Sequence, residues 1–316
     1  MAGAGMARSS GAFALARAWA VLLGSGVAWG ATQLFTKLAV ATGHPPLGLV
    51  LWQTAIGAVL LGLVLLIGRQ RLPLGRSALI FYAVCAVLGT ALPHTLSYTA
   101  IAHLPVGVVS ILIATVPMMT LTMSWALGLD RAGPRRVLGL ALGAGAVALV
   151  VAPEASLPEP GQALWSLIYL IVALSYAAEN VFIARHQPAG AGAVAVLFGL
   201  NLSALAMLLP LVAATGAWID LSSFGPPEQA LVAAALLHVV AYLGLIWLIG
   251  DAGPIFAAQI GYVVTLSGVG FGMAVLGEAH APWIWLALGL VLAGITLVRP
   301  QEKPEACTPQ NTAAGP

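Results

Sequence analysis

The sequence predicts an all-α polytopic membrane protein with ten transmembrane helices, arranged as two inverted five-helix repeats. The first observation is composition: 60% of the residues are hydrophobic and 7% are charged, whereas charged residues make up about 25% of soluble domains. The second is a series of long apolar stretches that bilayer-spanning helices would require. The third is the distribution of charged residues between those stretches, which follows a regular alternation.

Each apolar stretch is about 20 residues long, the length that an α-helix needs to cross a bilayer. The predicted spans are residues 18–39, 46–67, 77–101, 105–128, 136–152, 162–184, 191–214, 228–249, 254–276 and 282–298. Glycine, proline or charged residues occupy the short segments between them, as expected of turns. Arg8 and Arg17 precede the first span as in a signal peptide, but nine comparable stretches follow it. We therefore interpret it as a span that is retained.

These spans divide the chain into four segments. Residues 1–17 form an N-terminal cytoplasmic segment, and residues 18–152 contain the first five-helix repeat. Residues 162–298 contain the second, inverted repeat, and residues 299–316 form a cytoplasmic tail. Because the tail is rich in polar residues and proline and lacks apolar periodicity, we expect it to be disordered.

The basic residues orient the chain. With the N-terminus in the cytoplasm, all of them except Lys37 fall in cytoplasmic segments, as the positive-inside rule requires. They are Arg8, Arg17, Arg69, Arg71, Arg76, Arg131, Arg135, Arg136, Arg185, Arg299 and Lys303. The outer segments carry only acids: Glu154, Glu159, Asp220, Glu228 and Glu278. We therefore predict a multi-pass protein of the plasma (inner) membrane with both termini in the cytoplasm.

The two halves of the chain share residues at a constant spacing of 148 positions. The pairs are Lys37 with Arg185, Asp130 with Glu278, and Pro134 with Pro282. Each pair lies at a span boundary. Because five is an odd number of spans, the second unit would enter the membrane upside down. Inverted repeats of this kind are typical of secondary transporters, whose binding sites lie near the membrane midplane between the repeats.

Several short motifs resemble the EamA branch of the drug/metabolite transporter superfamily. They are the W-G-x(6)-K pattern of Trp29–Lys37, Gly128-Leu129-Asp130-Arg131, Leu276-Gly277-Glu278, and Asp251-Ala252-Gly253-Pro254. The resemblance covers residues 18–298 and implies a 5+5 inverted fold, a central cavity and movement of small solutes, often export. One departure is Trp52-Gln53, where the family often carries an arginine after an aromatic residue. An anion-binding role for that arginine is therefore not expected here.

Glu179 is the only acid that the predicted spans place well inside an apolar stretch. An ionised carboxylate in a bilayer costs roughly 2.5–3.5 kcal/mol or more. It is therefore protonated, paired with a cation, or hydrated by a cavity, and each state fits proton coupling or docking of a substrate amine. The alternative is a carboxylate that reaches the cytoplasmic interface near Arg185. Asn180, which follows it, is a further candidate.

Other polar side chains within the spans are candidates for a cavity wall. Gln33 and Lys37 lie on one helical face with Trp29, and Lys37 is a candidate for coupling or gating, or else an interfacial anchor. His94-x-x-x-Tyr98 and His238-x-x-x-Tyr242 occupy the third and eighth spans, which the repeat makes equivalent. The remaining intramembrane amides are Gln53, Asn201 and Gln259. Each of these side chains could bind substrate or hydrogen-bond to a neighbouring helix.

The sequence therefore predicts a secondary transporter that exports small metabolites, such as amino acids, their derivatives or drug-like amines, by alternating access. A facilitative channel or uniporter, and an intramembrane lipid-modifying enzyme, are the alternatives. No nucleotide-binding, metal-binding or catalytic motif occurs, so we expect no cofactor and no enzymatic activity. The expected partners are a small-molecule substrate and the lipid bilayer but no nucleic acid, and a homodimer is left open.

Overall fold

The computed structural model describes residues 3–41, 43–128, 133–151, 161–188, 191–222, 224–251 and 260–297, and these ranges contain helices but no strand. The elements are α1 (Gly3–Val40), α2 (Pro46–Ile67), α3 (Arg76–Ala86), the π-helix η1 (Val87–Ala91), α4 (Leu92–Ile101), α5 (Val106–Ile113), α6 (Val116–Ala126), α7 (Pro134–Val151), α8 (Gln162–His186), α9 (Ala193–Thr215), α10 (Pro226–Asp251), α12 (Ile260–Leu276) and α13 (Pro282–Leu297). The prediction of an all-helical chain is confirmed for these residues.

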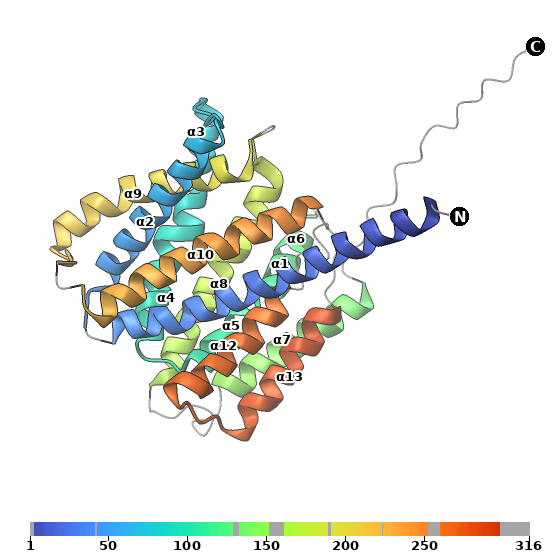
Figure 1. The fold of residues 1–316 in the computed structure, drawn as a ribbon. Coiled ribbons are helices and arrows are strands. Elements are labelled where there is room, and N and C mark those ends of the chain that lie inside the picture. Colours follow the sequence, from blue (N-terminus) through green and yellow to red (C-terminus); the bar gives the residue numbers. More distant parts are fainter. Residues whose placement is uncertain are drawn as a thin grey trace, which may run out of the picture.

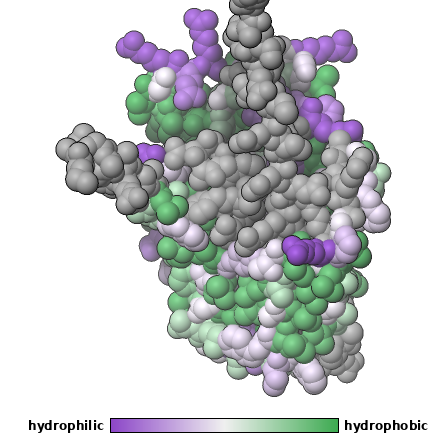
Figure 2. Space-filling view, turned by 90° about the vertical axis from the view of Figure 1, so that its right-hand side faces the viewer, coloured by the Kyte–Doolittle hydropathy of each residue, from purple (hydrophilic) through white to green (hydrophobic). Residues whose placement is uncertain are grey.

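Seven helical segments in the described ranges are long and apolar enough to cross a membrane. They correspond to the first four and the sixth to eighth predicted spans. Shorter apolar helices, Val137–Val150, Ile260–Leu276 and Pro282–Gly294, take the positions of the fifth, ninth and tenth. Figure 2 shows a broad hydrophobic surface, with strongly hydrophilic residues gathered mainly at one end of the view. The chain is therefore a polytopic membrane protein.

Prolines and glycines mark the ends of several helices, as the sequence predicts. The helices α2, α7, α10 and α13 each begin at a proline. Proline is tolerated there because a backbone N–H in the first turn has no partner within the helix, so its loss costs no hydrogen bond. The helix α9 ends at Gly216, whose φ of 66° lies in the left-handed region that glycine adopts without steric cost. The predicted acid Asp130, the candidate Gln259 and the tail 299–316 lie outside the described residues.

Two helices from distant parts of the chain flank α1. In Figure 1, α1 runs diagonally past α10 on one side and α12 on the other. The helix α8 packs against α4 and α6 in a comparable way, α2 packs against α9, and α7 pairs with α13 at one side of the bundle. Every one of these contacts joins elements from different halves of the predicted repeat.

Glycines allow close approach at these helix contacts. A Cβ added to Gly26 would lie 2.5 Å from the Val263 Cβ, and one added to Gly30 would lie 3.0 Å from the backbone nitrogen of Gly268. Both positions therefore need a residue without a side chain. Gly26 and Gly30 thus let α1 approach α12 closely, as small residues commonly do in membrane helix pairs.

The third predicted span is not a uniform α-helix. It consists of α3, the π-helix η1 and α4, so the five residues Val87–Ala91 interrupt the α-helical hydrogen-bond pattern at mid-span. Pro93 follows in the first turn of α4. Short π-segments within helices are frequent at functional sites. Here the segment contributes directly to the cavity described below.

Candidate functional site

A small cavity lies among α2, η1, α4, α8, α9 and α10. Its polar lining consists of Gln53, Thr54, Thr90, His94, Glu179, Asn201, His238 and Tyr242. Its volume is about 40 Å³, which exceeds the roughly 10–15 Å³ that a single water requires. Pockets that hold drug-sized ligands have volumes of roughly 300–1,000 Å³. The cavity has room for water but would have to widen to admit a metabolite.

Glu179 lies on the wall of this cavity, on helix α8. Its side chain is 5% exposed, and no other described residue forms a hydrogen bond or ion pair with its carboxylate. The carboxylate packs against Gly89 of η1, where any Cβ would overlap it. Arg185, on the same helix, is exposed. Glu179 is therefore an acid held at an internal cavity rather than one that extends to the surface beside Arg185.

Aromatic rings from the four helices α1, α4, α8 and α10 meet at this cavity and next to it. The ring centroids of His94 and His238 are 5.4 Å apart, and those of His238 and Tyr242 are 5.6 Å apart. Trp29 of α1 meets Tyr242 edge to face at 5.4 Å, and Tyr176 meets His94 at 6.4 Å. The Nδ1 atom of His94 is buried without a hydrogen-bond partner. The two His-x-x-x-Tyr motifs thus meet at one site.

Two glutamines are held by tyrosine hydroxyl groups. The Tyr98 hydroxyl donates to Gln53 Oε1 at 2.5 Å, and the Tyr169 hydroxyl donates to Gln33 Oε1 at 3.3 Å. Gln53 lines the cavity, whereas Gln33 does not. Asn201 also lines it, with its amide group donating to the Leu197 carbonyl at 2.8 Å. Of the proposed amides, Gln53 and Asn201 therefore share the cavity with Glu179.

Two other predicted residues lie elsewhere. The Lys37 ammonium donates to three backbone carbonyls at the end of α4, the nearest being that of Ile101 at 2.7 Å. Asn180 is exposed and lies 3.5 Å from the Thr120 hydroxyl. Consecutive helical residues point in directions about 100° apart, which is why Asn180 does not share the cavity with Glu179. Neither residue lines the cavity.

Sequence reasoning missed Gly89 and Tyr176 as parts of the site. Gly89 is one of 36 glycines in the chain, and nothing in its immediate neighbours marks it as the residue beneath Glu179. Tyr176 lies three positions before Glu179 on α8, and residues at this spacing share a helical face. That spacing was a signal that could have identified Tyr176.

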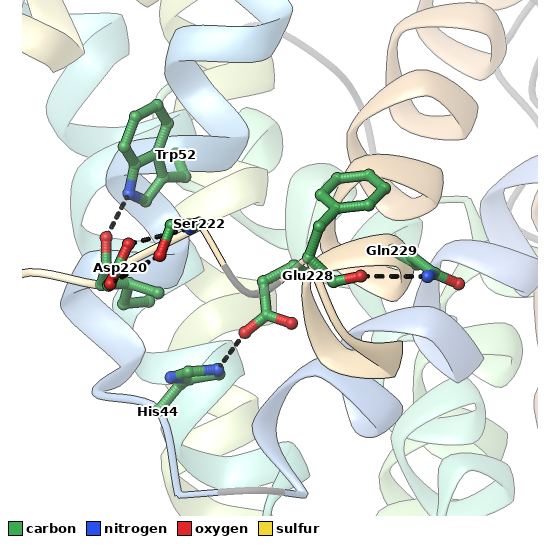
Figure 3. A network of polar contacts seen from close by, with 8 residues as sticks. His44, Trp52, Asp220, Ser222, Glu228 and Gln229 are labelled. Carbon is green, nitrogen blue, oxygen red and sulfur yellow. Dashed lines mark hydrogen bonds and ion pairs between the residues drawn. The ribbon is translucent and has the colours of Figure 1, made fainter.

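A second polar cluster, also missed, joins the segment between α1 and α2 to the start of α10. Figure 3 shows His44 pointing to Glu228, with Nε2 and Oε1 2.7 Å apart. Glu228, which the sequence places at the outer end of the span predicted over 228–249, lies in the first turn of α10 and is 4% exposed. Nearby, bonds from the Ser222 backbone and hydroxyl group lower the pKa of Asp220.

No grouping of three or more His, Cys, Asp or Glu side chains within the described ranges could hold a metal ion. The cavity lining offers a carboxyl group, amides, imidazoles and an aromatic ring, which are groups that can hold a proton, form hydrogen bonds and contact apolar groups. These groups suit an amphiphilic solute that carries a cationic or hydrogen-bonding group.

Comparison with known proteins finds a family that the first half of the chain resembles. The model of the EamA-like transporter family matches residues 17–152, which are nearly the residues of the first predicted repeat. The resemblance to the EamA family is therefore confirmed. The direct match covers α1 to α7, so it includes Trp29, Gln53 and Gly89 but not Glu179.

A likeness to other proteins extends over both halves of the chain. The chain is 27% identical to the uncharacterized inner membrane transporter YedA of Escherichia coli strain K12, over 86% of this chain and 87% of that protein. The same values hold for YedA of E. coli O157:H7. A solved crystal structure matches with a TM-score of 0.58 and 17% identity, covering 90% of this chain and 97% of that one. That last likeness concerns the fold alone. The chain thus resembles EamA-like transporters over residues 17–152 and an inner membrane transporter over most of its length.

Proposed function

We propose that this EamA-type protein is a proton-coupled secondary transporter that exports small amphiphilic metabolites bearing an amine. The observation that carries the proposal is the buried Glu179 carboxylate, which lies at an internal cavity without a hydrogen bond from any described residue. A charged carboxylate in such a place is costly unless a proton or a cation neutralises it. A proton and a substrate ammonium group would therefore compete for the same carboxylate, which couples their movements.

The surroundings of Glu179 support the substrate class. His94, His238 and Tyr242 supply ring faces and hydrogen-bonding atoms, and Gln53 and Asn201 supply amides. Ring faces attract cations and stack on apolar groups. Amino acids, their derivatives and drug-like amines combine an ammonium group with an apolar body, and they match this lining.

The packing of the bundle supports alternating access by two inverted five-helix repeats. The helix α1 packs against α10 and α12, and α8, its counterpart at the 148-residue spacing, packs against α4 and α6. The pairs α2 with α9 and α7 with α13 join corresponding helices of the two units. In such transporters a fixed site is exposed to each side in turn by rocking of the repeats. We also propose that the protein lies in the inner membrane and that both of its termini face the cytoplasm.

Solute-driven proton movement tests the proposal. Purified protein is first screened by thermal shift against amino acids, amines and nucleosides, and the stabilising solutes are then added to proteoliposomes containing pyranine. We expect such a solute to drive proton movement, and we expect Glu179→Gln to abolish it, because an amide cannot exchange a proton. Solute flux should fall at least about tenfold, since loss of a charge-assisted contact is worth that much in an equilibrium.

Two variants control for the position and the charge. Asn180→Ala alters the next residue on α8, outside the cavity, and Glu228→Gln removes another buried carboxylate far along the sequence, paired with His44. Both should transport as the parent protein does. If the rate of solute flux changed neither with the pH gradient nor with Glu179→Gln, proton coupling through this residue would be wrong.

A further inference from the structure

A lysine from another helix binds the start of the turn between α4 and α5, residues 102–105. Lys37 of α1 donates to the carbonyl oxygens of Ile101 at 2.7 Å, Ala102 at 3.1 Å and Leu104 at 2.9 Å. These carbonyls close the C-terminal end of α4, where unpaired carbonyls and the helix dipole favour a positive charge. The lysine thus joins α1 to the end of α4.

A glutamate from another part of the chain binds the end of the same turn, where α5 begins. The Glu278 carboxylate, which follows α12, accepts the backbone N–H of Val106 at 2.6 Å and of Gly107 at 3.0 Å. These are the first residues of α5, whose free N–H groups and positive dipole end favour an anion. The His280 ring lies 3.6 Å from Glu278, and burial lowers the pKa of His280 although the nearby carboxylate opposes this shift.

The helix α4 connects this turn to the cavity. His94, which lines the cavity, and Tyr98, which bonds to Gln53, both lie on α4. At its other end α4 continues from η1, where Gly89 packs against the Glu179 carboxylate. The π-helix interrupts the regular hydrogen-bond pattern, as at many hinges. The end of α4 is thus tied to α1, the turn that follows it is tied through the start of α5 to Glu278, and the other end of α4 meets the proposed coupling residue.

We propose that α4 is a gate helix that pivots at η1 and is locked by a latch, which we define as Lys37 and Glu278. In the locked state the latch closes the cavity toward the α4–α5 turn, and its release lets α4 swing away and open the cavity on that side. This inference rests on the proposed function, and it gives Lys37 and Glu278 a positioning role in transport rather than contact with the substrate.

Thiol accessibility tests the latch without any transported solute. Ser97 lies on α4 between His94 and the turn, is partly buried, and has its hydroxyl 3.4 Å from the Tyr169 hydroxyl. We use Ser97→Cys in the full chain, with a membrane-impermeant, cationic methanethiosulfonate reagent added from each side of the membrane in turn. Cys307 is replaced by serine in every chain used, and the parent chain with Ser97 retained gives the background from Cys85, which is fully buried.

Lys37→Met and Glu278→Gln should each speed labelling of Ser97→Cys about tenfold from the side of the turn, because each removes hydrogen bonds to a charged group. Lys37→Arg keeps the charge and the donors and should label more slowly than Lys37→Met. Glu228→Gln breaks the contact of α10 with His44 instead, and should label as Ser97→Cys alone does. Should Lys37→Met fail to fold, judged by its size-exclusion profile, Glu278→Gln carries the test.

Unchanged labelling in the folded latch variants would overturn the proposal, as would an equal rise in Glu228→Gln. These outcomes are distinct from a failure of the proposed function. If Glu179→Gln left solute flux unchanged while the latch variants labelled faster, the gate would be supported and proton coupling through Glu179 would be wrong. If solute flux depended on Glu179 while the latch variants labelled at the same rate as Ser97→Cys alone, proton coupling would be supported and the gate would be wrong.

Discussion

Gly89→Ala is expected to lower transport at least about tenfold while leaving the protein folded. A Cβ at this position would overlap the Glu179 carboxylate, which is the mobile end of a flexible side chain and can move aside. The carboxylate would then leave its place in the cavity that His94 and His238 also line, and small displacements of a reacting group can cost large factors in rate. Alanine is also a better helix former than glycine. Solute flux in proteoliposomes, together with thermal unfolding in detergent, would measure both effects.

Gly270→Ala is the matched control for this substitution. Gly270 lies within α12, and a Cβ there would meet no atom within 4 Å, so transport should remain at the parent rate. The double variant Gly89→Ala with Glu179→Gln should transport no worse than Glu179→Gln alone, because both changes act on one carboxylate. Additive losses in the double variant would mean that Gly89 acts through something other than Glu179.

Much of the fold follows from local sequence properties. The apolar stretches are readable because lipid selects for hydrophobicity along each span, and the described helices occupy the predicted stretches, although three are shorter than a full span. Glu179 could be predicted for the same reason, since a lone acid in an apolar stretch is costly. The interruption at η1 was not predicted, because Val87–Ala91 consists of residues that also occur in regular membrane helices.

The contacts of the site could be predicted less well because they join distant residues. Glu278 and Val106 are 172 positions apart, and Lys37 and Ile101 are 64 apart. Helical periodicity places Trp29, Gln33 and Lys37 on one face of α1. Its three members nevertheless have different neighbours. Trp29 meets the histidine–tyrosine cluster, Gln33 meets Tyr169, and Lys37 meets the end of α4. Periodicity identifies a face but not what packs against each position on it.

Gly30→Val should destabilise the protein by about 1–3 kcal/mol, the usual cost of adding bulk to a packed interior. Gly30 is buried where α1 meets α12, and a Cβ there would lie 3.0 Å from the Gly268 backbone nitrogen and would overlap the Ser267 hydroxyl. The Ser267 side chain could rotate, but the backbone of α12 cannot move without separating the two helices. The melting temperature in detergent should therefore fall.

Gly24→Val tests whether close packing is the cause. Gly24 lies on the same helix, is exposed, and has no atom within 4 Å of an added Cβ. Its substitution should change stability by less than about 0.5 kcal/mol, as surface changes usually do. If the two variants lowered the melting temperature equally, valine itself would be responsible. A loss confined to Gly30→Val would instead show that α1 needs a glycine there to pack against α12, and that the glycine of the W-G pattern serves helix packing while its neighbour Trp29 faces the cavity cluster.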